Sequence, residues 1–138
     1  YDGDNYTENY YKDLLDANKN IIISSPAISG QKVYELINML KEKQASGVQI
    51  TIVTWTPDSY GFGDAAYWMQ LHEDMCKAGF YIKTVEESCE RFAVIDQEVV
   101  WYGNINLLAK TKVDDSIMRV LSNEIAGELM EITFGDNS

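Results

Sequence analysis

The sequence is poor in the residues from which disulfide frameworks and metal centres are built. Its 138 residues include two cysteines, Cys76 and Cys89, and a single histidine, His72. Two cysteines do not make a disulfide framework, and these three residues lack the regular spacing of a zinc site. We therefore expect free thiols, with neither a metal nor another cofactor.

Long apolar runs are also missing, although 46% of the residues are hydrophobic. No segment approaches the length of a membrane span, and no segment resembles a signal peptide. These absences argue against a membrane-spanning protein. The sequence predicts a soluble, cytoplasmic domain.

Basic residues are scarce. Lysine and arginine number 11 against 22 acidic residues, which gives a formal net charge of −11. Such a surface opposes non-specific binding to nucleic acid or to anionic membranes, because both depend on cations that neutralise phosphates. One local basic site remains compatible with this charge.

The length fits one domain with a real hydrophobic core, and no repeat or linker divides the chain. We therefore treat residues 1–138 as a single domain. The sequence begins with Tyr1 rather than methionine. We interpret the chain as a domain excised from a longer protein.

Helical and strand patterns alternate in the first part of the chain, and closely spaced strands follow. Thr7, Ser29 and Ser122 are predicted helix N-caps, and another helix is expected over residues 64–78. Strands are expected over residues 20–25, 48–54, 80–84, 91–95, 99–102 and 116–120. This order predicts an α/β fold in which helices flank a mixed sheet.

The chemically suggestive side chains lie on the hairpin predicted from the fourth and fifth strands. Cys89 and Arg91 are two apart, so we expect them to share one face of a strand. Asp96 ends that strand at the turn. The returning strand ends in a glycine and two asparagines: Gly103, Asn104 and Asn106.

This spacing resembles the phospholipase D superfamily, whose signature is His-x-Lys-x4-Asp-x6-Gly-Ser-x-Asn. Here the six positions are occupied, in order, by Cys89, Arg91, Asp96, Gly103, Asn104 and Asn106. The resemblance covers nearly the whole chain and implies the phospholipase D-like fold. The runs over residues 91–96 and 100–103 look most like domains attached to bacterial helicases or nucleases, which implies a nucleic-acid-processing parent protein.

The resemblance also implies a mechanism that Cys89 interrupts. Family members attack a phosphodiester with the motif histidine, while a histidine of a second motif protonates the leaving group. Motif lysines and asparagines hold the phosphate oxygens, and the two motifs come from one chain or a homodimer. The main hypothesis is a degenerate, weakly active or inactive accessory module. Arg91, Asn104 and Asn106 would bind a phosphate-bearing ligand, and Asp96 and Gly103 would be structural.

Two other functions stay open. An active phosphodiesterase or nuclease would use a Cys89 thiolate whose pKa Arg91 lowers, or a second motif supplied elsewhere. A dimerisation or interaction module would need neither residue. Plainer roles also remain: Cys89 as a small packed residue, Asp96 as a turn former bonding its own backbone, and His72 as a half-buried helix residue.

Overall fold

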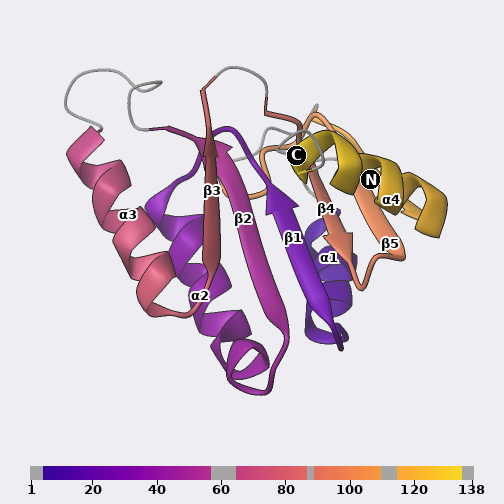
Figure 1. The fold of residues 1–138 in the computed structure, drawn as a ribbon, viewed down its shortest axis with the longest axis horizontal. Coiled ribbons are helices and arrows are strands. Elements are labelled where there is room, and N and C mark those ends of the chain that lie inside the picture. Colours follow the sequence, from indigo (N-terminus) through magenta and orange to yellow (C-terminus); the bar gives the residue numbers. More distant parts are fainter. Residues whose placement is uncertain (1–4, 57–64, 87–88, 110–114, 135–138) are drawn as a thin grey trace.

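The described part of the chain forms one mixed sheet of six strands. Helices lie on both faces of this sheet (Figure 1). The computed structural model describes residues 5–56, 65–86, 89–109 and 115–134. The strands are β1 (Asn20–Ser24), β2 (Gln49–Trp55), β3 (Tyr81–Val85), β4 (Phe92–Ile95), β5 (Val99–Gly103) and β6 (Ile117–Leu121). The helices are α1 (Thr7–Leu15), α2 (Gly30–Ala45), α3 (Ala65–Lys77) and α4 (Asn123–Phe134). Within these ranges, no helix has the length and apolar character needed to cross a membrane.

Strand order is β3-β2-β1-β4-β5-β6, which confirms the predicted mixed sheet. β1, β2 and β3 are parallel, whereas β4 pairs antiparallel with β1 and opens an antiparallel half. β1, β2 and β3 therefore end, and β4 begins, at one end of the sheet, here called the upper end as in Figure 1. The β4–β5 turn lies at the opposite, lower end.

Each face of the sheet has its own core. The larger core lies beneath α1, α2 and α3 and includes Trp101 of β5, which is fully buried and meets the Tyr10 ring edge-on at 5.6 Å. The smaller core lies beneath α4, where Phe92 and Val94 of β4 pack with Ala126 and Leu129. Among the described residues, α4 is the helix that covers this second face, so its position determines access to the upper end from that side.

Two of the three predicted helix caps are confirmed. The hydroxyls of Ser29 and Ser122 each accept a backbone N–H from the first turn of the following helix. The prediction for Thr7 is wrong: Thr7 is already helical, and the capping position belongs to Tyr6, which makes no capping hydrogen bond with its side chain. Tyr6 is 1% exposed, so burial of its ring fixes the start of α1 instead.

Candidate functional site

The β4–β5 hairpin divides the motif between the two ends of the sheet. Phe92 pairs with Tyr102 and Ile95 with Val99. Cys89 and Arg91 precede β4 and the asparagines follow β5, so both groups lie at the upper end. Asp96 lies in the turn at the lower end. The candidate site therefore consists of Cys89, Arg91 and the segment 103–106.

Cys89 lies half-buried between the sheet and the end of α4. Its Sγ is 3.5 Å from the Ser24 hydroxyl and 3.9 Å from the Val53 carbonyl oxygen. The side chain packs against the small core beneath α4. It also faces a hollow of about 180 Å³, the Cys89 hollow, lined by Ser24, Val53, Val85, Cys89, Glu90, Ile132 and Thr133.

The surroundings of Cys89 favour the neutral thiol. Burial, the largest cause, raises its pKa above the ordinary value of 9.0, and the Glu90 carboxylate adds to the rise. The hydrogen bond with Ser24 and the charge of Arg91 lower the pKa but do not outweigh burial. Arg91 therefore lowers the pKa of Cys89 as expected, but the depressed pKa that an active thiol would need is not found, because desolvation of the thiolate is the stronger influence.

Arg91 contacts Asn106, as the motif spacing suggested. Arg91 Nε donates a 3.0 Å hydrogen bond to Asn106 Oδ1. The loop that carries Asn106 is fixed because its neighbours Ile105 and Leu107 are buried in the large core. A guanidinium and a carboxamide are thus held together at the upper end of the sheet.

Cys89 and Arg91 do not follow strand alternation. β4 begins at Phe92 rather than at residue 91, so both residues lie before the strand. Cys89 packs on the α4 side, whereas Arg91 reaches the loop after β5. Their spacing of two therefore does not place them on a shared strand face, because the alternation rule holds only within a strand.

Asn104 and Gly103 serve the connection to β6. The Asn104 carboxamide oxygen accepts the Ser116 N–H at 2.7 Å, and the Asn104 N–H donates to the Ser116 carbonyl at 3.0 Å. A Cβ on Gly103 would lie 2.2 Å from the Ser116 carbonyl oxygen, so β6 approaches too closely for a side chain. The carboxamide oxygen of Asn104 is thus hydrogen-bonded to the backbone of Ser116, whereas that of Asn106 accepts from Arg91.

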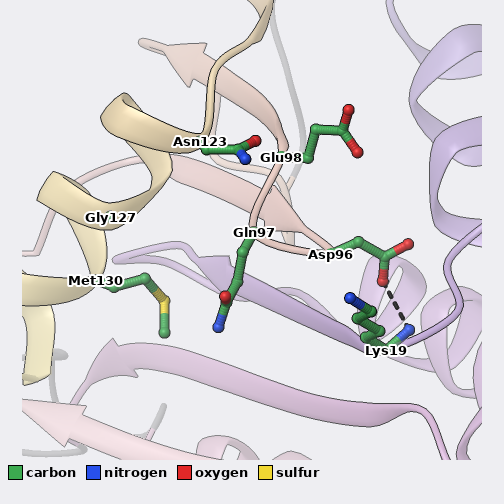
Figure 2. A pocket seen from close by; sticks show the side chains of 7 residues that line it. All are labelled: Lys19, Asp96, Gln97, Glu98, Asn123, Gly127 and Met130. Carbon is green, nitrogen blue, oxygen red and sulfur yellow. Dashed lines mark hydrogen bonds between the residues drawn. The ribbon is translucent and has the colours of Figure 1, made fainter.

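Asp96 fastens the hairpin turn to the start of β1 (Figure 2). Its carboxylate accepts backbone N–H groups from Asn18, Lys19 and Asn20 at distances of 2.7 to 3.2 Å. The expectation that it bonds its own local backbone is therefore wrong, because the antiparallel β1–β4 pairing brings three more distant amides within reach. Asp96 also lines the pocket drawn in Figure 2, which lies at this lower end. Its volume is about 380 Å³, and Cys89 is not among its lining residues.

Ser24 and Glu90 are site residues that the sequence did not reveal. The Ser24 hydroxyl donates to the Glu90 carbonyl at 2.6 Å and so ties the segment before β4 to the end of β1. The Glu90 carboxylate accepts the Tyr102 hydroxyl at 3.3 Å, and its charge raises the pKa of Tyr102. Ser24 ends a buried apolar strand, and neither residue belongs to the motif, so no sequence signal marked them.

His72 does not supply the missing imidazole. It is half-buried in α3, where its ring meets Trp68 edge-on with centroids 5.0 Å apart. α3 covers the face of the sheet opposite to α4, whereas Cys89 packs on the α4 side. Within the described residues, no group of three or more metal-ligating side chains gathers.

Comparison with known protein families gives a match over most of the chain. The family described as "Cardiolipin synthase, PLD-like domain" matches residues 10–133. No curated protein sequence matches.

Three solved structures share the fold at low sequence identity. NucT from Helicobacter pylori superposes with a TM-score of 0.68 and 9% identity, over 94% of this chain and 86% of its own. Nuc, a phospholipase D family member from Salmonella typhimurium, superposes with a TM-score of 0.63 and 14% identity, over 88% of this chain and 80% of its own. Phosphatidylserine synthase from Haemophilus influenzae superposes with a TM-score of 0.57 and 11% identity, over 96% of this chain but 36% of its own. These structures share the fold, and the family match over residues 10–133 shows that the chain belongs to the family of phospholipase D-like domains.

Proposed function

We propose that this domain binds a phosphate-bearing ligand at the upper end of the sheet without hydrolysing it. One observation carries the proposal. The motif's nucleophile position holds a half-buried cysteine with a raised pKa, while the Arg91–Asn106 pair at the anion-binding positions is formed. Binding chemistry is thus retained where the chemistry of attack is weakened.

Two features of the site argue against hydrolysis: the protonated thiol and the lack of a nearby imidazole. A thiol is nucleophilic as the thiolate, and burial makes the Cys89 thiolate scarce at neutral pH. The only imidazole of the chain belongs to His72, on a helix that covers the other face of the sheet. Without a positioned acid the leaving oxygen is expelled as an alkoxide, and general acid catalysis is worth about two to four powers of ten in rate.

Anion binding is supported by the way Arg91 is held. Asn106 accepts from Nε, which orients the planar guanidinium and leaves its terminal nitrogens for two parallel hydrogen bonds to phosphate oxygens. Glu90 and the net charge of −11 oppose this attraction. We therefore expect weak, local binding that falls with added salt.

The proposed setting is a larger protein that processes nucleic acid. Support comes from the runs over residues 91–96 and 100–103, which look like phospholipase D-like domains attached to bacterial helicases and nucleases. The acidity of this chain makes it an accessory module rather than the main nucleic-acid grip. In this role the domain would hold one phosphate of a strand delivered by its neighbours.

The test is a titration followed by backbone amide chemical shifts. The probes are dimethyl phosphate and a short single-stranded DNA oligonucleotide, each added to wild type, Arg91→Met and Arg91→Lys. We expect saturable shifts at residues 103–106, a loss of at least about tenfold in affinity for Arg91→Met, and a smaller loss for Arg91→Lys. Lys77→Met is the matched control, since Lys77 pairs with Glu73 on the exposed side of α3. Equal affinity of Arg91→Met and wild type would contradict the proposal.

Self-association is the second candidate function. Met118 and Leu121 lie on the edge strand β6 and are 61% and 62% exposed. Exposed apolar side chains on an edge strand favour pairing with another chain, and the family brings two motifs together. Sedimentation velocity at low and high salt tests this idea: a dimer that strengthens with salt supports it, and a monomer under both conditions removes it.

A further inference from the structure

The last turn of α4 forms one wall of the Cys89 hollow. Ile132 and Thr133 contribute this wall. The others come from β1, β2 and β3 near their ends and from Cys89 and Glu90, which precede β4. Figure 1 shows the end of α4 reaching the upper end of the sheet. On the α4 side of the sheet, the position of this turn therefore determines how open the hollow is.

Lys83 of β3 anchors the turn. Its Nζ donates a 2.5 Å hydrogen bond to the Thr133 carbonyl oxygen and lies 5.0 Å from the centre of the Phe134 ring. The last carbonyls of a helix lack intrahelical partners and carry a partial negative charge. α4 has no basic residue in its own last turn, so a lysine from the neighbouring strand supplies the compensating cation.

We propose that the last turn of α4, residues 131–134, is a cover over the Cys89 hollow that Lys83 holds closed. When Lys83 releases the Thr133 carbonyl oxygen, the turn detaches, Phe134 leaves the small core against which it packs, and the motif thiol becomes exposed. The rest of α4 stays in place because Ala126 and Leu129 are buried in the core beneath it. This cover would regulate access to the site of the proposed function, but it concerns the thiol and does not require that the site bind phosphate.

Alkylation of Cys89 by iodoacetamide measures the opening. All variants carry Cys76→Ser, because Cys76 is exposed and is the only other cysteine. Lys83→Met removes the ammonium group and keeps an apolar stem of similar length. We expect the alkylation rate to rise about five- to tenfold, since the rate follows the population of the open state.

The direction of this change separates access from electrostatics. Removing a cation disfavours a nearby thiolate, so a purely electrostatic effect of Lys83→Met would slow alkylation. Faster alkylation therefore reports exposure. Lys77→Met is the matched control and should leave the rate unchanged, because its ion pair with Glu73 lies on α3.

Global unfolding is the competing explanation, and urea denaturation of each variant measures it. The proposal requires that the rate gain of Lys83→Met exceed the gain computed from its loss of global stability. Phe134→Leu gives a second test if Lys83→Met does not fold: it removes the ring beneath the ammonium and should speed alkylation about twofold to threefold. The proposal is overturned if the folded variants are alkylated at the wild-type rate. It is also overturned if the loss of global stability fully explains the gain in alkylation rate.

Discussion

Substitution of Asp96 should separate the two tasks that this residue performs in the turn. The Asp96 carboxylate holds three backbone amides at the start of β1, and its backbone has a φ of 55°. Left-handed backbone costs an alanine about 1 kcal/mol and costs glycine almost nothing. Loss of the carboxylate leaves the three amides to water at a net cost of about 1 kcal/mol each.

The expected losses in the free energy of unfolding therefore increase from Asp96→Asn to Asp96→Gly to Asp96→Ala. Asp96→Ala loses the acceptor and also the tolerance of left-handed backbone that the short polar side chain of aspartate gives, and should cost about 4 kcal/mol. Asp96→Gly loses only the acceptor and should cost about 3 kcal/mol. Asp96→Asn keeps one carbonyl acceptor and should cost about 1 kcal/mol.

Urea denaturation followed by circular dichroism measures these losses, with an unchanged m-value as the condition for comparing midpoints. Two results would contradict the roles assigned to the Asp96 carboxylate and backbone. One is a cost below about 1 kcal/mol for Asp96→Ala, which would mean that water replaces the carboxylate without loss. The other is a larger cost for Asp96→Gly than for Asp96→Ala, which would mean that the left-handed backbone carries no strain.

Three further predictions follow from individual residues. Gly103→Ala should lower stability by about 2 to 3 kcal/mol because the Ser116 backbone cannot give way, whereas the control Gly127→Ala in α4 meets open space and should raise it by about 0.5 to 1 kcal/mol; urea midpoints measure both. Gln97→Gly should raise stability by about 1 kcal/mol by relieving a φ of 57°, and a loss would contradict this. Alkylation of Cys89 in the Cys76→Ser background should keep accelerating above pH 9, because its pKa is raised above 9.0; a plateau below pH 8 would show a depressed pKa instead.

The fold could be predicted from the sequence because its elements are marked locally. Buried runs such as Ile21 to Ile23 and the caps Ser29 and Ser122 lie where apolar periodicity and capping rules put them. The start of α1 could not be predicted in this way. Burial of the Tyr6 ring decides it, and burial is a tertiary property that the local pattern around Thr7 does not contain.

The site was only partly predictable, for a related reason. Motif spacing placed Arg91 and Asn106 at one end of the sheet, because the hairpin register brings together the residue before β4 and the loop after β5. Their hydrogen bond was not predicted and comes from the structure. The environment of Cys89 was not predictable. Its pKa depends on packing against α4 and on Ser24, which lie far from the motif along the chain. Likewise, Asp96 bonds to amides 76 to 78 residues away, which no local turn rule anticipates.

Hydrolysis of bis(4-nitrophenyl) phosphate is the decisive assay for a site that binds phosphate without cleaving a phosphodiester. Wild type, Cys89→Ala and Cys89→His are compared at equal concentration, after urea denaturation has shown that each is folded. We expect no turnover by wild type and at most a trace from Cys89→His, since one imidazole without a second acid completes half of the chemistry. Turnover by wild type that Cys89→Ala abolishes would show a sulfur nucleophile at work and would contradict a binding site that does not cleave.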